Sequence, residues 1–227
     1  MSNQRFLSVF DVLGPVMVGP SSSHTAGALR LGKMGRALLG ATPNNALIEL
    51  HGSFAETGRG HGTDKAIIAG LLGMEPDNED IKHSFDLATD SGMQFTFQVA
   101  DLGDDCHPNS LRMSLSAGSE KIQMQGASIG GGQIEVTRLD NYPISLSGEF
   151  DTLLVVAGDQ PGTVNAITGW LLSQNINVAY LSVSREGRGG DAIMVIETDD
   201  PVPDSIVAGI RNFEWVHWAR RIPKLSN

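Results

Sequence analysis

FDTLLVVAGDQPGTVNAITGWLLSQNINVAYLSVSRE, residues 150–186, contains the clearest secondary-structure signals in the chain. Its opening run, FDTLLVVAG, predicts a buried strand because apolar residues dominate it and a glycine ends it. Pro161 lies near the start of the following helix, where its missing N–H group is not needed. Val164, Ile167 and Leu171 then recur at the spacing of a buried helical stripe. INVAYLSVSRE returns as a strand, so the stretch predicts a β-α-β unit.

The same pattern continues to the end of the sequence. GRGGD predicts a hairpin turn, and AIMVIETD predicts the partner strand. A helix restarts after Pro201 and Pro203, and EWVHWARRI follows as a last strand. The order β-α-β-β-α-β is the ferredoxin-like arrangement. Because the texture of the sequence changes near YPISLSG, residues 142–148, we expect one domain over residues 1–146 and a second over residues 147–227.

The N-terminal region is less regular and predicts a mixed α/β domain. Residues 25–39 read as a helix whose glycines allow another backbone to approach closely, and residues 46–54 read as a strand. Residues 63–72 predict a second helix, opened by Thr63 or Asp64 as its cap. Four alternating segments read as strands of an antiparallel part: QFTFQVA (94–100), SLRMSLSA (110–117), EKIQMQGAS (120–128) and QIEVTRL (133–139). The fold class is therefore α+β or α/β, with two domains.

Composition narrows the function. A net charge of −10 over 227 residues argues against a nucleic-acid partner, which needs clustered Lys and Arg. No apolar run approaches the ~20 residues of a membrane span, and the start MSNQRFLSVF lacks the pattern of a signal peptide. The single cysteine, Cys106, excludes an internal disulfide and a cysteine-ligated iron–sulfur cluster built from this chain alone. We expect a cytoplasmic protein without membrane contact.

The polar stretch GPSSSHTAG, residues 19–27, stands at the start of the first predicted helix. We expect Ser22 or Ser23 to precede the first helical turn, where free N–H groups and the helix dipole attract a carboxylate or a phosphate. His24 adds a group that can transfer a proton near neutral pH. The alternative is an ordinary capped helix with a surface histidine.

Three further stretches are as polar as the first. TGRGHGTD, residues 57–64, places Arg59, which can bind a carboxylate with two hydrogen bonds, and His61 before the second helix; a flexible glycine loop is the alternative. CHPNS sets His107 and Asn109 around a proline-fixed turn. SIGGGQI, residues 128–134, offers three glycines that permit either the close approach of a ligand or a bulge.

The histidines also allow a different reading. His24, His61 and His107 could bind zinc and form a metal hydrolase, although they lack the close spacing typical of such sites. We therefore predict no metal site on this chain.

The C-terminal half has a polar turn of its own. Backbone N–H groups of Gly162 and Thr163, in and after DQPG, could hold a carboxylate at the start of a helix, while Asp159 or Asn177 holds an amine. These residues predict an effector site for an amino acid. A plain turn and a helix end are the alternative.

Taken together, the four polar stretches, in this order and preceded by SVFDVLG (residues 8–14), resemble the β chain of the two-chain, iron–sulfur-dependent L-serine dehydratases, and the C-terminal half resembles an ACT domain. The resemblance implies β-elimination of water from L-serine, giving pyruvate and ammonia. It implies a partner α chain that holds a [4Fe-4S] cluster, whose open iron acts as a Lewis acid on the departing hydroxyl. In the family that the chain resembles, the first region is also described as an allosteric, substrate-binding domain.

The resemblance assigns roles to particular residues. His24 and His61 are the candidates for proton transfer. Arg59 departs from the lysine expected at its position, which keeps the charge but changes the hydrogen-bond geometry. The implied substrate-binding residues are Ser21, Ser22, Ser23, Thr25, Arg59, Thr63, Asp64, His107 and Asn109.

Two expectations concern assembly. ACT domains commonly associate in pairs, which covers an exposed sheet edge, so we expect self-association through this half. The competing function is a free-standing amino-acid sensor whose ACT domain reports to another protein. That reading leaves GPSSSHTAG and TGRGHGTD without a role.

Overall fold

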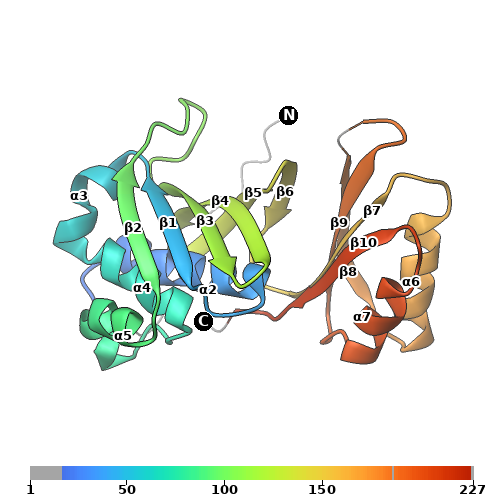
Figure 1. Cartoon of the computed structure of the whole chain (residues 1–227), viewed down its shortest axis with the longest axis horizontal. Coiled ribbons are helices and arrows are strands. Elements are labelled where there is room, and N and C mark those ends of the chain that lie inside the picture. Colours follow the sequence, from blue (N-terminus) through green and yellow to red (C-terminus); the bar gives the residue numbers. More distant parts are fainter. Residues whose placement is uncertain (1–16, 186, 226–227) are drawn as a thin grey trace. The chain divides into compact units, whose positions relative to one another are not determined.

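The computed structural model describes residues 17–185 and 187–225, apart from the side chain of Arg59 (Figure 1). Within them the chain forms two compact units, one of residues up to 121 with 125–135, the other of residues 122–124 with 136 onward. The segment SVFDVLG lies outside the described residues. No described helix combines the length and the apolar character needed to cross a bilayer.

The N-terminal elements alternate helices with strands before an antiparallel series. The helices are η1 (Ser22–Gly27), α2 (Ala28–Leu39), α3 (Ser53–His61), α4 (Thr63–Leu72), η2 (Glu79–His83) and α5 (Ser84–Asp90). The strands are β1 (Asn45–Leu50), β2 (Gln94–Val99), β3 (Ser110–Ala117), β4 (Glu120–Gly130), β5 (Gln133–Leu139) and β6 (Tyr142–Leu146). They form one sheet in the order β2-β1-β3-β4-β5-β6 (Figure 1).

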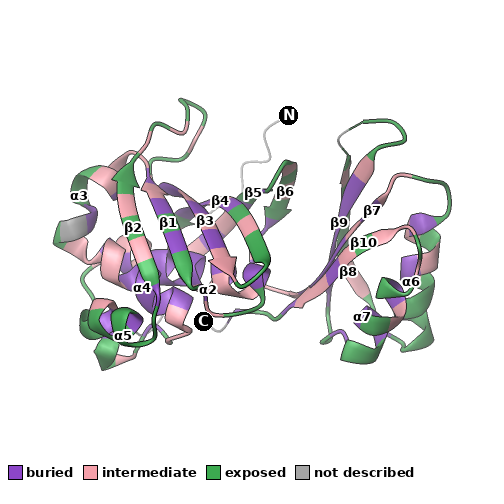
Figure 2. Cartoon of the chain, viewed as in Figure 1, coloured by how far each residue is buried: buried purple, intermediate pink, exposed green. Residues whose placement is uncertain are grey.

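Alternation along the strands decides which face of this sheet is buried. Ala46 and Ile48 of β1 pair with Leu115 and Met113 of β3, and all four side chains are buried. Figure 2 shows the strands coloured by burial, with buried and less buried segments along β1 and β3. The intervening residues of β1 and β3 are exposed or half-buried. The apolar face therefore packs on helices, and the mixed α/β fold predicted for this half is confirmed.

Helices α2 and α4 cross at two glycines. A Cβ on Gly32 would collide with the carbonyl oxygen of Ile67, and one on Gly70 would collide with that of Leu29. Neither position has room for a side chain, so the two backbones pack directly on each other. This confirms that a glycine in the first helix allows a close backbone approach.

One predicted strand boundary was wrong, and so was the alternative interpretation of TGRGHGTD as a flexible glycine loop. The strand predicted to Phe54 ends at Leu50, because Gly52 turns the chain at a φ of +53° and α3 begins at Ser53. TGRGHGTD is not a loop: its first five residues lie in α3, which the fully buried Phe54 anchors. Its glycines are accommodated in a helix because tertiary packing outweighs their low helix propensity.

The helix caps also differ from the prediction. Ser21 caps η1, because its Oγ accepts a hydrogen bond from the backbone N–H of His24 at 3.1 Å, and Ser22 and Ser23 lie inside the first turn. Helix α4 is preceded by Gly62 in the left-handed region, with no side-chain cap, so Thr63 and Asp64 are not caps. The cap position has a left-handed backbone, which suits glycine, and Thr63 and Asp64 are the first two residues inside the helix.

The C-terminal unit contains β7 (Asp151–Gly158), α6 (Thr163–Ser173), β8 (Val178–Arg185), β9 (Asp191–Thr198), α7 (Asp204–Arg211) and β10 (Val216–Ile222). Its sheet has the order β10-β7-β9-β8, with antiparallel neighbours throughout. Leu153 and Val155 of β7 pack with Ile167 and Leu171 of α6 in one apolar core. The predicted ferredoxin-like β-α-β-β-α-β order is confirmed. The boundary at residues 146 and 147 stays a prediction.

Candidate active site

Helix η1 presents His24. It is a π-helix, a rare geometry that occurs often at functional sites. Thr25, which is buried, donates a hydrogen bond from Oγ1 to the carbonyl oxygen of His61 at 3.1 Å. This bond joins GPSSSHTAG to TGRGHGTD, two of the four polar stretches, although they are far apart in the sequence.

Helix α3 supplies two hydroxyl groups to the same histidine. Nε2 of His24 lies 3.1 Å from Oγ of Ser53 and 3.1 Å from Oγ1 of Thr57. Ser53 and Thr57 are four residues apart, so they share one face of the helix. Neither residue was predicted as part of the site. Ser53 was assigned to a strand instead. Helical i, i+4 spacing of two hydroxyl residues is the signal that could have found them.

The two histidines named as proton-transfer candidates lie together. The ring centroids of His24 and His61 are 5.1 Å apart, at an interplanar angle of 50°. Burial, and after it the neighbouring His61, lowers the pKa of His24 below its ordinary value, while a hydrogen bond with the backbone of Ser53 opposes the shift. His24 is therefore neutral at pH 7, as a general base must be.

Three buried polar atoms of these stretches have no partner. Within the described part of the chain, Nδ1 of His61, Oγ1 of Thr63 and Oγ of Ser128 are buried without a hydrogen bond. Thr63 and Ser128 are fully buried. A buried polar atom that lacks a partner costs free energy, so each of the three is a candidate contact for a bound ligand. Ser128 was not among the predicted binding residues.

The other two polar stretches meet the first at Ser128. The backbone N–H of Ser128 donates to the carbonyl oxygen of Asn109 at 3.0 Å. A Cβ on Gly27 would collide with the Ser128 side chain, so SIGGGQI packs directly on η1. Gly52, just before α3, packs on Pro108 of CHPNS in the same way. All four stretches therefore converge, which their sequence positions could not show.

The remaining predicted residues lie as follows. His107 accepts a hydrogen bond at Nδ1 from the backbone N–H of Asn109 at 3.0 Å, and burial lowers its pKa. It is thus a neutral ring with its proton on Nε2, held by its own loop. Ser22 and Ser23 are half-buried in η1, and Asp64 accepts from the backbone N–H of Lys65. Arg59 belongs to α3, and its side chain lies outside the described residues.

No three His, Cys, Asp or Glu side chains among the described residues are grouped so that they could hold a metal ion. The pair of His24 and His61 therefore lacks a third ligand in that part of the chain, and the zinc hydrolase reading has no ligand set there. Cys106 donates to the carbonyl oxygen of Leu102 at 3.1 Å and accepts from Gln125.

In the C-terminal unit the predicted effector residues separate. Oδ2 of Asp159 accepts from Arg185 at 3.3 Å and from the backbone N–H of Gly189 at 3.4 Å. Gly162, at a φ of +94°, precedes α6 at the same end. Asn177 lies at the opposite end, where Nδ2 donates to Oδ2 of Asp199 at 2.6 Å.

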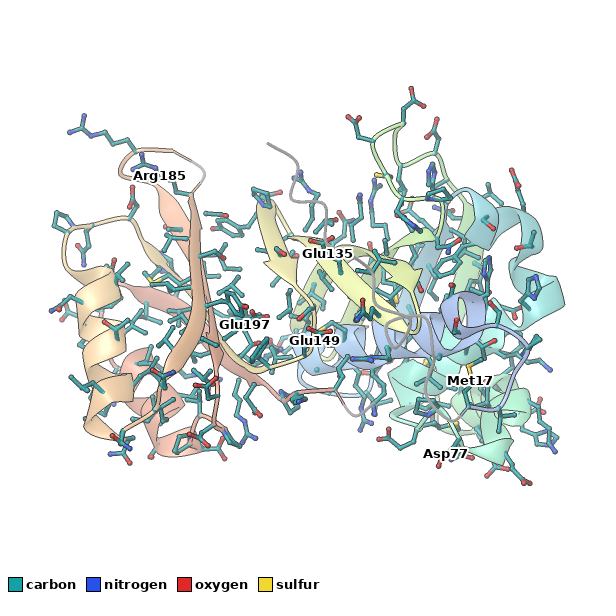
Figure 3. The ribbon with its side chains drawn as sticks, turned by 180° about the vertical axis from the view of Figure 1, so that it is seen from behind. Met17, Asp77, Glu135, Glu149, Arg185 and Glu197 are labelled. Atoms are coloured by element: carbon teal, nitrogen blue, oxygen red, sulfur yellow. The ribbon has the colours of Figure 1, made fainter. Side chains whose placement is uncertain are left out.

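The strand register fixes this separation. Gly158 pairs with Asp191 at one end of β9, and Val178 pairs with Thr198 at the other. Seven residues of strand span about 23 Å. Figure 3 shows Arg185 and Glu197 at correspondingly different levels of the sheet. One copy of this unit cannot bring Asp159 and Asn177 to the same small ligand.

Comparison with known proteins identifies the family to which this chain belongs. The chain is 42% identical to a Bacillus subtilis protein named probable L-serine dehydratase, beta chain, over 89% of this chain and 92% of that protein. It is 36% identical to the L-serine dehydratase, beta chain, of Peptoniphilus asaccharolyticus, over 91% of this chain and 94% of that protein. The chain belongs to the L-serine dehydratase β-chain family.

Two family models match separate parts of the chain. The model for the serine dehydratase beta chain matches residues 8–103, and the model for the ACT domain matches residues 152–213. The β chain is also 33% identical to L-serine dehydratase 2 of Escherichia coli, over 56% of this chain and 33% of that protein. The stretch around His24 and His61 therefore lies within the region that defines the family.

Proposed function

We propose that this chain, together with an α chain, forms an L-serine dehydratase that converts L-serine to pyruvate and ammonia in the cytoplasm. The observation that carries the proposal is the convergence of the four polar stretches around two histidines and three unpartnered buried atoms. The names of two similar β chains, and coverage of one third of an E. coli L-serine dehydratase, support a second chain.

The residues of this chain do not fit a [4Fe-4S] cluster. Such clusters are held mainly by several cysteine thiolates, whereas this chain has one cysteine. Cys106 is half-buried and engaged with Leu102 and Gln125. We therefore assign the cluster to the α chain.

This chain contributes the binding and proton-transfer groups. Helix α4 begins without a side-chain cap, and the backbone N–H of Lys65 donates to Asp64, so the proposed anion would bind at the N–H groups of Thr63 and Asp64. Oγ1 of Thr63 and Nδ1 of His61, both unpartnered, lie in the sequence on either side of that start. A serine carboxylate bound there would satisfy them, with Ser22, Ser23 and Arg59 as further ligands. His24 or His61 then accepts the α-proton, since elimination of water from serine requires loss of that proton.

A reconstitution experiment tests the proposal. The purified chain, an α chain and iron are combined anaerobically, and pyruvate formation from L-serine is measured. The complete mixture is expected to form pyruvate and the isolated chain to form none. Pyruvate from the iron-free isolated chain would contradict the division of labour. Failure of this chain to associate with any α chain would instead favour a free-standing sensor.

We also propose that the ACT half, from residue 147, pairs with a second copy along β8. This strand is an edge of its sheet and exposes Tyr180, Leu181 and Val183. Exposed apolar edges of this kind are usually covered. Antiparallel pairing of two β8 strands would bring Asn177 of one copy toward Asp159 and Gly162 of the other. The effector site for L-serine would then need both copies.

Sedimentation and calorimetry of the full chain test this pairing. Leu181→Asp places a charge on the β8 edge and is expected to give monomers, while Leu172→Asp, on an exposed position of α6, serves as control. If the Leu181 variant still pairs, the β8 interface is wrong. Asn177→Ala and Asp159→Ala are each expected to weaken serine binding by about 3- to 10-fold.

A further inference from the structure

The hydrogen bonds around His24 determine which of its ring nitrogens carries the proton. A neutral imidazole has one N–H donor and one acceptor nitrogen, and its neighbours select the tautomer. Here both neighbours at Nε2 are hydroxyl oxygens of α3, on Ser53 and Thr57. A hydroxyl has a single hydrogen to donate. The other contacts of the Ser53 and Thr57 hydroxyls therefore restrict whether each can donate to Nε2 or must accept from it.

The proton of Thr57 is already in use. Oγ1 of Thr57 lies 2.9 Å from the carbonyl oxygen of Ser53, one helical turn earlier. A carbonyl can only accept, so the Thr57 hydroxyl donates there, as threonines inside helices commonly do. Toward Nε2 of His24, at 3.1 Å, Thr57 can then only accept. This contact is a hydrogen bond only if Nε2 carries the hydrogen.

Ser53 agrees with this assignment. Its Oγ can accept a second branch of the Nε2–H bond at 3.1 Å, or donate to Oγ1 of Thr57 at 3.4 Å. Both arrangements leave the hydrogen on Nε2. In the reverse tautomer Ser53 would donate to Nε2, and the Thr57 oxygen and Nε2 would then face each other at 3.1 Å with no hydrogen between them. Only the tautomer with the hydrogen on Nε2 makes the contact with Thr57 a hydrogen bond while Thr57 keeps its bond to the Ser53 carbonyl.

We propose that Ser53 and Thr57 are positioning residues that hold neutral His24 with its proton on Nε2, so that Nδ1 is the basic nitrogen offered to a ligand. A proton accepted at Nδ1 produces an imidazolium whose Nε2–H remains bonded to the α3 hydroxyls. The titratable neighbour is His61, at the end of α3, and Phe54 packs edge-on against the ring at 5.3 Å. The catalytic consequence depends on the proposed function, but the tautomer does not.

Nitrogen-15 NMR of the full chain, labelled at histidine, measures the tautomer directly. The His24 signals are assigned by their loss in His24→Gln. In the wild-type chain at neutral pH, Nε2 is expected to be the protonated nitrogen and Nδ1 the unprotonated one. An unprotonated Nε2 would overturn the proposal without any further variant.

Thr57→Val and Thr57→Ser form the matched pair. Valine removes the acceptor, so the His24 signals should shift toward a mixture of tautomers, while serine keeps the hydroxyl and should preserve the wild-type signals. Unchanged His24 signals in the valine variant would overturn the positioning role. Circular dichroism of both variants checks that each remains folded.

The complex with the α chain gives a second readout. Thr57→Val is expected to lower kcat/KM about 3- to 10-fold, and Thr57→Ser is expected to restore it. Because the lost acceptor stabilised the imidazolium, the acid limb of the pH profile should move to lower pH. A shifted tautomer with undiminished turnover would uphold the positioning role and overturn His24 as a catalytic group. Loss of turnover with unshifted signals would overturn the positioning role.

Discussion

Polar groups are arranged oppositely in the two units. Around His24 and His61, buried atoms such as Oγ1 of Thr63 and Oγ of Ser128 have no partner. In the ACT unit the conspicuous polar side chains are paired with each other: Asp159 with Arg185, and Asn177 with Asp199. Because unpaired buried atoms destabilise a protein unless a ligand satisfies them, the first arrangement supports the binding site proposed within one chain. The second satisfies these side chains within one copy, so the proposed effector site depends on a second copy.

The largest effect should follow from removing either histidine of the site. His24→Ala and His61→Ala are each tested in the reconstituted enzyme, and a proton-transfer residue is expected to lower kcat by about 10²- to 10⁴-fold when lost. His83→Ala, an exposed position on η2, is the control and should retain full turnover. Losses below about threefold for both site variants would return the pair to a structural role.

The next largest effect is expected from glycine substitutions, which should change stability in opposite directions in the two units. Gly70→Ala forces a methyl group against the carbonyl oxygen of Leu29, so it should lower the free energy of unfolding by about 1–3 kcal/mol. Gly169→Ala in α6 meets no atom within 4 Å and should instead add about 0.5–1 kcal/mol, because alanine favours a helix. Chemical denaturation of the full chain measures both. Equal changes in the free energy of unfolding for the two variants would contradict the close packing of α2 against α4.

Replacing one buried threonine in each unit compares a partnered hydroxyl with an unpartnered one. The Thr198 hydroxyl in the ACT unit donates to the carbonyl oxygen of Asp200 at 2.8 Å and also lies 3.1 Å from that of Asp151, so Thr198→Val should cost about 1–3 kcal/mol of stability. Thr63 is unpartnered, so Thr63→Val should raise stability by about 1–3 kcal/mol and raise the KM for serine. If Thr63→Val destabilises the chain as much as Thr198→Val, Thr63 has a structural partner and the site assignment weakens.

The smallest effect concerns one carboxyl group of the ACT unit. Burial, and after it the neighbouring Glu149, raises the pKa of Glu197, with the Ser147 backbone opposing. A raised pKa stabilises the fold below the unfolded value of 4.5, and that contribution is lost as pH rises through the folded pKa. Glu197→Gln should therefore increase stability at pH 7 and not below pH 4.5. Glu214→Gln, at an exposed position, should change neither, and a pH-independent gain at position 197 would contradict the assignment.

The sequence predicted the ACT unit element by element because its signals are local. Val164, Ile167 and Leu171 mark one helix face, and alternating strands need no knowledge of distant residues. In the first half the helix α4 was predicted to the residue, from 63 to 72, for the same reason. The segment 57–61 was not, because its glycines indicate a loop unless the buried Phe54 is known to anchor a helix.

The site itself was predicted in its members more than in its geometry. His24, His61 and Thr63 were singled out from their polar context, but Ser53 and Ser128 were not. Their contribution depends on contacts across distant segments, such as Gly27 against Ser128, which no local pattern reports. The separation of Asp159 from Asn177 is likewise a property of strand register, which the sequence of either turn does not contain.

The structure of the reconstituted complex with bound L-alanine, a serine analogue without the departing hydroxyl, tests the central claim most directly. The analogue is expected beside His24 and His61, with its polar atoms about 3 Å from Oγ1 of Thr63 and Nδ1 of His61. Density for the amino acid only at the ACT unit, with those two atoms still unpartnered, would contradict the account.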